Sequence, residues 1–147
     1  MNDLVENGNV NKDSVITIAT NTLALVVEKG NPLNIKSVSD LASRKIRTVL
    51  CDAAQPCGKY AAQMLKRANV AVQPRSWETS VSGVTQKVAS GEADAGIVYV
   101  SDALANASKL DVVPIDANIN VVNNYPIASL TKLSTTAQKA AQTFIDF

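Results

Sequence analysis

Short apolar strands alternate with amphipathic helical segments along most of this chain of 147 residues. The pattern is clearest at residues 49–58 (VLCDAAQPCG) and 95–103 (AGIVYVSDA), where an apolar strand runs directly into the start of a helix. A chain that alternates strand and helix forms an α/β layer structure, because each helix carries the chain back to begin another parallel strand. We therefore expect an α/β fold with a mostly parallel sheet flanked by helices.

The hydrophobic pattern also predicts the individual elements. Strands are predicted at residues 15–27, 46–50, 70–72, 95–100, 111–115 and 125–130. Helices are predicted at residues 3–10, 40–43, 58–68, 81–89 and 134–147, with another short helix after residues 101–102. The predicted N-caps are Ser39, Thr79 or Ser80, Ser101 with Asp102, and Ser134. Because 15–27 is too long for one ordinary strand, we expect either a bend or change of partner near residues 20–22, or two kinked core strands.

The composition excludes several functions. The chain contains no histidine, so the commonest general base and the commonest metal ligand are missing, and a small α/β enzyme is disfavoured. The net charge is +1 and only 4% of the residues are aromatic, which gives no case for binding nucleic acid or an anionic membrane. No apolar run is long enough to span a bilayer, so we expect no direct membrane insertion of this chain.

Three predicted helix starts follow strands and are candidates for a ligand site: residues 56–58, 80–82 and 99–102. Ligands of open parallel sheets bind at the carboxyl ends of the strands. The first N–H groups of a helix have no partner within the helix, and the helix dipole is positive at that end. The sequence therefore predicts a crevice that binds an anion.

The first of these starts is at Pro56, which suits the first turn of a helix because it has no N–H to leave unpaired. Gly58 lets a ligand approach the backbone closely. The N–H groups of Cys57 and Gly58 would then face the crevice. The alternative is an ordinary helix start with no ligand.

The other two starts offer hydroxyl groups as well as N–H groups. Ser80 or Ser82 either donates to an anion or caps the helix, whereas the N–H of Val81 is a donor in both cases. The hydroxyl of Tyr99, at the end of an apolar strand, either donates to an oxyanion or stays in the core with a backbone partner.

No lysine or arginine falls in these three helix starts. A site built from preorganised N–H and O–H donors binds a fully deprotonated oxyanion without a counter-charge. Such a site rejects a ligand that carries a proton, because two donors then face each other. We therefore expect selection by protonation state.

Cys51 and Cys57 are the only cysteines. Without histidine, two thiols do not form an ordinary structural zinc site. They either form a disulfide across the short loop, which indicates an oxidising and exported setting, or remain two independent buried thiols.

Four segments resemble the molybdate-binding proteins of bacterial ABC importers, which belong to the type II periplasmic binding proteins. They are NTLALVVEKGNPL (21–33), QPCG (55–58), VSGVTQKVASGEADAGIVYVSDA (81–103) and NNYPIAS (123–129). The resemblance runs from about residue 3 to the end, and GEADAGIVYVSDA is its most specific part. It implies a protein outside the cytoplasm, in the periplasm or as a cell-surface lipoprotein in the full-length precursor, that delivers an oxyanion to a membrane permease.

The resemblance also implies a ligand set. The anion, molybdate or tungstate, is held by hydrogen bonds alone, with no cofactor and no metal other than that of the oxyanion itself. The implied donors are the backbone N–H groups of Cys57 and Val81 and the hydroxyl of Tyr99. Further possible donors lie beside them: Gly58, Ser80 and Ser82. The cysteine pair is similar to that of some actinobacterial members, which implies a disulfide.

The chain departs from this family at its beginning, because the two serine-bearing segments of the first lobe have no counterpart here. We expect residues 1–20 to be a remnant of the first lobe and the start of a crossover strand, and residues 21–127 to be the second lobe. Residues 128–147 would then be the return crossover and a partial C-terminal helix. Half of the ligand shell would be missing, so we expect weak or undetectable binding by this chain alone.

Two alternatives remain open at this point. The chain could belong to a receptor for another oxyanion, such as sulfate or thiosulfate. It could also be the effector-sensing domain of a transcription regulator, because such domains share this fold. A disulfide would disfavour the second alternative, because transcription regulators are cytosolic and disulfides are rare in the cytosol.

Overall fold

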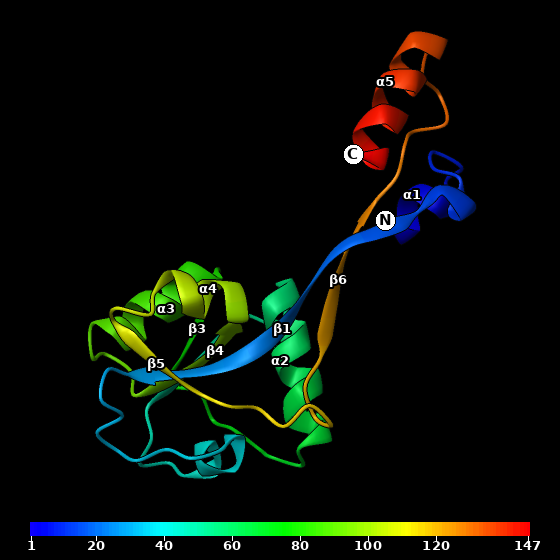
Figure 1. Cartoon of the computed structure of the whole chain (residues 1–147). Helices are drawn as coiled ribbons and strands as arrows, with labels where there is room; N and C mark the ends of the chain where they lie inside the picture. Colours follow the sequence, from blue (N-terminus) through cyan, green and yellow to red (C-terminus); the bar gives the residue numbers. More distant parts are fainter. The chain divides into compact units, whose positions relative to one another are not determined.

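The computed structural model describes residues 1–147 (Figure 1). The chain forms two compact units: unit 1 comprises Met1–Thr20 and Asn123–Phe147, and unit 2 comprises Asn21–Val122. The three candidate helix starts all lie in unit 2. The assignment of these segments to two lobes of a larger protein stays a prediction.

The elements are as follows. The helices are α1 (Asn2–Glu6), α2 (Pro56–Arg67), α3 (Val81–Ala89), α4 (Val100–Ala105) and α5 (Thr135–Asp146). The strands are β1 (Ile16–Glu28), β2 (Thr48–Cys51), β3 (Ser76–Glu78), β4 (Ala95–Tyr99), β5 (Leu110–Val113) and β6 (Val122–Ile127). Two 3₁₀ turns span Lys12–Ser14 and Val38–Ala42.

The strands form one sheet in the order β3-β2-β4-β1-β5, with β6 also paired to β1. β2 runs parallel to both β3 and β4. β1 lies between β4 and β5 and is antiparallel to both. The expected α/β fold with flanking helices is confirmed. The sheet is mixed: β3, β2 and β4 form its parallel part, and the antiparallel pairs all involve β1, so the parallel character that we expected is limited to these three strands.

The sheet of unit 2 has a hydrophobic core on each face. The side chains of β1 alternate between the two cores, as the pleat of a strand requires. Leu25 packs with Met64 of α2 on one face. Val26 packs with Val84 and Val88 of α3 on the other. All five residues are completely buried, so both faces of the sheet are fully covered at this point.

The long segment predicted at 15–27 is a single uninterrupted strand, β1. Its pairing with β4 begins only at Leu23, and its first residues, 16–20, lie in unit 1 with most of β6. The predicted change of partner is therefore confirmed, whereas the alternative of two separate strands is wrong.

The strand predicted at 70–72 is wrong. Val70 and Val72 pack half-buried against the core, and the N–H of Val70 bonds to the carbonyl of Leu65 at the end of α2. The strand lies further along the chain, as β3. It gave no hydrophobic signal because two of its three residues are polar, Ser76 and Glu78, and both bond to a lysine of α3.

Two predicted N-caps are wrong. Ser37 and not Ser39 precedes the 3₁₀ turn at Val38–Ala42, where the N–H of Ser37 bonds to the carboxylate of Asp40 at 2.9 Å. Tyr99 occupies the N-cap of α4, so Ser101 and Asp102 lie inside that helix. The caps of α3 and α5 are confirmed: Ser80 and Ser134.

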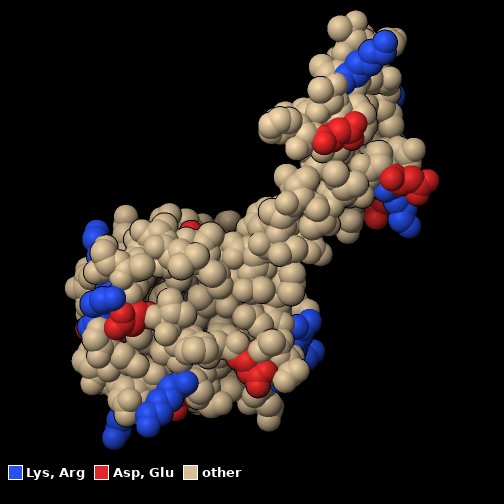
Figure 2. Space-filling view, viewed as in Figure 1, with Lys and Arg blue, Asp and Glu red and all other residues tan.

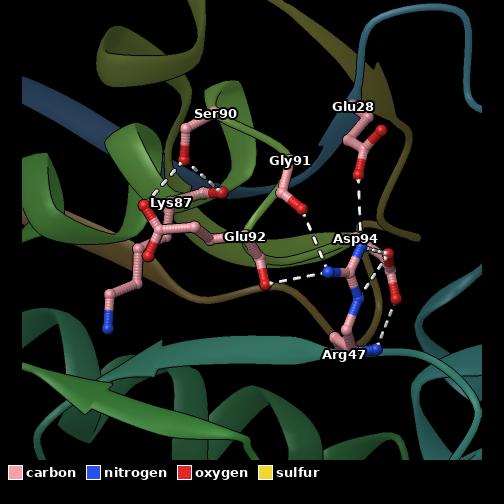
Figure 3. A network of polar contacts seen from close by, with 7 residues as sticks. All are labelled: Glu28, Arg47, Lys87, Ser90, Gly91, Glu92 and Asp94. Atoms are coloured by element: carbon pink, nitrogen blue, oxygen red, sulfur yellow. Dashed lines mark hydrogen bonds and ion pairs between the residues drawn. The ribbon is translucent and has the colours of Figure 1, made fainter.

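An ion pair between the part-exposed Arg47 and the buried Asp94 holds the amino ends of β2 and β4 together (Figure 3). The Arg47 side chain donates to the carbonyls of Gly91 and Glu92 at 3.0 and 3.2 Å and to the carboxylate of Asp94. Asp94 also accepts the N–H of Arg47 at 2.6 Å. Glu28 lies 3.6 Å from the guanidinium. The turn before β4 is thereby tied to the residue before β2.

Asp94 is only 8% exposed. Burial acts to raise the pKa of its carboxyl, but the hydrogen bonds and the charge of Arg47 outweigh burial and lower it. Because the folded state has the lower pKa, the pair stabilises the fold above the ordinary pKa of aspartate. That contribution is lost as the pH falls through the lowered value.

Charged side chains are scattered over the face shown in Figure 2, with lysine and arginine interspersed among aspartate and glutamate. This distribution agrees with the net charge of +1. None of the helices combines the length and the apolar character that crossing a membrane requires.

Thr48, at the start of β2, provides a test of the packing of the sheet. It is 1% exposed, and its hydroxyl has no hydrogen-bond partner. A buried unsatisfied hydroxyl costs about 1–3 kcal/mol. Thr48→Val keeps the shape and removes the hydroxyl, so it should raise the free energy of unfolding by about 1 kcal/mol in a urea titration.

Thr85 is the matched control, because it is equally a buried threonine but its hydroxyl donates to the carbonyl of Ser82 at 2.9 Å. Thr85→Val should lower the free energy of unfolding. A stabilising effect at Thr85, or a destabilising one at Thr48, would contradict this interpretation.

Candidate functional site

The three predicted helix starts lie at the carboxyl end of the parallel part of the sheet. β2 ends at Cys51, which is in register with Glu78, the last residue of β3. β4, which is parallel to β2, ends at Tyr99. After these strands the chain enters α2, α3 and α4 respectively. The topology therefore brings Cys57, Val81 and Tyr99 to the same edge of the sheet.

A disulfide joins Cys51 to Cys57, as the resemblance implied. The alternative of two free thiols is wrong, since no free cysteine remains. Both residues are buried, at 0% and 5% exposure. The bond spans the loop between β2 and α2, so the second residue of the helix is covalently attached to the end of the strand.

Position 58 requires glycine because neighbouring backbone atoms leave no room for a side chain. A Cβ at this position would lie 2.1 Å from the carbonyl oxygen of Asp52 and 2.7 Å from that of Cys51. The close approach that the sequence analysis assigned to a ligand is therefore made, on this side of Gly58, by the loop itself. The disulfide and this contact together hold the start of α2 against the end of β2.

The two longer helices at this edge begin differently. α2 has no side-chain cap: its N-cap residue, Gln55, makes no capping hydrogen bond, and Pro56 follows. An uncapped start leaves the first N–H groups, that of Cys57 among them, without a partner inside the helix. In α3, Ser80 accepts the N–H of Gly83 at 3.2 Å. This cap leaves the N–H of Val81 for another acceptor.

The two serines at α3 are therefore not equivalent. Ser80 takes the capping role that the sequence analysis gave as one of its two alternatives. Ser82 is exposed in the first turn, and its carbonyl accepts the hydroxyl of Thr85. Both serines lie at the candidate edge beside Val81, but only Ser80 has a structural role for its hydroxyl.

Tyr99 is half-buried and packs against both hydrophobic cores. Its position is fixed by pairing with Leu23 of β1. The side chain of Asn120 bonds to both the N–H and the carbonyl of Leu23, at 3.1 and 2.9 Å. Asn21 donates to Ser101 at 2.8 Å. These amide contacts join residues far apart in the chain, so no sequence pattern indicated them.

The electrostatic surroundings include a carboxylate that the sequence analysis missed. Glu78 ends β3, and its pKa is lowered, first by the hydrogen bond from Lys87 at 2.6 Å and also by one from Ser76. The only sequence signal was two polar residues in what proved to be a strand. Asp52 is exposed in the neighbouring loop, where it accepts the N–H of Ala54 at 2.8 Å.

No group of three or more acidic, cysteine or histidine side chains is placed to hold a metal ion. The candidate donors at the three helix starts are backbone N–H groups and hydroxyls. Such groups hydrogen-bond an oxyanion and leave it chemically unchanged.

The fold is that of one lobe of a periplasmic binding protein. It is shared with a Clostridium difficile protein described as the substrate-binding domain of a molybdenum ABC transporter, with a TM-score of 0.74 and 26% identity over 99% of this chain and 66% of that one. A family model of bacterial extracellular solute-binding proteins matches residues 1–147. The chain belongs to that family.

The molybdate-binding protein ModA of Mycobacterium tuberculosis is 41% identical to this chain over 116 residues. The match covers 79% of this chain and 44% of ModA, so the chain spans less than half of that relative. These relatives are described as binding proteins. The resemblance inferred from the sequence is confirmed.

The regulatory domain of CcmR from Synechocystis, in complex with 2-PG, has the same fold. Its TM-score is 0.70, with 20% identity over 96% of this chain and 66% of that domain. At this identity the likeness concerns the fold alone.

Gly58→Ala tests how the first helix start is held. Its methyl group would overlap backbone atoms that no rotamer change moves away. We expect a large loss of stability in thermal unfolding. The matched control is Gly83→Ala in the first turn of α3, where the methyl group would lie 3.1 Å from Oε2 and 3.2 Å from the Cβ of Glu78, so that a shift of a few tenths of an ångström relieves the contact. Equal losses at the two glycines would contradict the packing described here.

Proposed function

We propose that this chain forms the second lobe of an extracytoplasmic solute-binding protein that captures molybdate for an ABC importer. In this proposal residues 21–127 form the lobe. Residues 1–20 are a remnant of the first lobe and the start of a crossover strand, and residues 128–147 are the return crossover and a partial C-terminal helix. The donors are the N–H groups of Cys57 and Val81 and the hydroxyl of Tyr99. Further donors are available beside them: Gly58, Ser80 and Ser82.

One observation carries the proposal: three helix starts meet at one sheet edge with no lysine or arginine among residues 56–58, 80–82 and 99–102. Neutral donors that are fixed in place stabilise a fully charged oxyanion. The 41% identity to ModA supports molybdate as that anion. Tungstate has nearly the same size and charge as molybdate, so the same donors should bind it.

Membership of the family supports the proposed partner and location. The chain belongs to an extracellular family, and a disulfide persists in oxidising compartments. The periplasm, or the cell surface as a lipoprotein, agrees with both observations. A solute-binding protein in that place delivers its ligand to a membrane permease.

Tyr99→Phe tests the proposed ligand set. In the complete protein, which would contain both lobes, losing one hydroxyl donor should weaken molybdate binding by about 1–3 kcal/mol, or roughly 5- to 150-fold in Kd. Isothermal titration calorimetry with molybdate measures this directly. Sulfate, titrated in the same way, should bind much more weakly than molybdate.

Tyr125→Phe is the control, because Tyr125 is an exposed tyrosine of β6 outside unit 2. It should bind molybdate as the wild type does. An unchanged Kd in Tyr99→Phe would remove Tyr99 from the site. Sulfate binding as tight as molybdate binding would overturn the assignment to molybdate.

A further inference from the structure

Glu78 contacts two of the candidate helix starts. Its carbonyl accepts the N–H of Asp52 at 2.8 Å, in the loop that leads to α2. Its side chain packs against Gly83 in the first turn of α3, where an added Cβ would lie 3.1 Å from Oε2 and 3.2 Å from the Cβ of Glu78. Glu78 is therefore next to the first turn of α3, which carries the Val81 donor, and is bonded to the loop that leads to Cys57.

The carboxylate of Glu78 is ionised and poorly exposed to water. Its side chain is 16% exposed, and the hydrogen bond from Lys87 is the largest cause of its lowered pKa. Water screens a charge in such a place only partly. Without a compensating cation, this charge would repel an anion bound at either helix start.

Lys87 supplies the compensating cation. Its Nζ lies 2.6 Å from Oε1 of Glu78 and 3.0 Å from the hydroxyl of Ser76. It is four residues after Gly83, so both residues are on the face of α3 that meets β3. Figure 3 shows its side chain extending away from Arg47, whose charge is matched by Asp94.

We propose that Lys87 is an affinity-determining residue of the anion site, although it does not touch the ligand. By neutralising Glu78 it keeps the surroundings of the Val81 donor free of net negative charge. This inference rests on the proposed function. It explains how a site of neutral donors retains affinity for an oxyanion with a carboxylate packed beside it.

Lys87→Met tests the inference, because it removes the charge and keeps much of the side chain. The complete protein is titrated calorimetrically with molybdate, tungstate, sulfate and phosphate. The Kd of whichever anion binds should rise roughly three- to tenfold, the order expected for a partly screened charge within a Debye length. The loss should shrink at high salt. Lys87→Arg retains the charge and should retain the wild-type affinity.

The double variant Glu78→Gln with Lys87→Met separates charge from packing, because it removes both members of the ion pair. We expect it to regain the wild-type Kd even where its thermal stability stays low. An unchanged Kd in Lys87→Met, or the same loss in the double variant, overturns the inference and leaves the proposed function intact. If the wild type binds none of the four anions, the proposed function fails and the inference fails with it.

Discussion

The parallel pairing of β2 with β3 and β4 is the constraint on which the candidate site depends. Because these strands point the same way, the helices that follow them begin at one edge of the sheet. Separate contacts then hold each start: the disulfide to Cys57, the Ser80 cap, and the packing of Tyr99 against two cores. The Arg47–Asp94 pair secures the opposite ends of two of these strands.

Several helices and their N-caps could be predicted from the sequence, because they depend on residues close together in the chain. Apolar spacing indicated α2 and α3, and Ser80 and Ser134 were recognisable caps. The features that were not predicted depend on contacts between residues further apart in the chain. β3 was missed because its polar residues depend on Lys87 in the next helix. The contact of Gly58 with the carbonyls of Cys51 and Asp52 was not predicted, because these groups come together only in three dimensions.

The proposed site combines uncharged hydrogen-bond donors with a nearby carboxylate, Glu78, whose charge is neutralised by Lys87. Neither of these two side chains is among the proposed ligand contacts. In the proposed site Cys57 donates through its backbone N–H, since its sulfur is bonded to Cys51 in the disulfide. Fixed neutral donors favour a fully deprotonated anion, because a proton on the ligand would face a donor of the protein. This is the selectivity expected of an oxyanion receptor. Membership of the bacterial extracellular solute-binding family agrees with a role in binding a small solute.

The most direct test of the account is the amide NMR spectrum of the complete protein during a molybdate titration. The account predicts that the largest shifts occur at the N–H groups of Cys57 and Val81, because their hydrogen bonds go to the anion. Amides at the amino ends of the strands, such as that of Gly91 in the turn before β4, should not move. Saturation with molybdate that leaves Cys57 and Val81 unshifted would contradict the account.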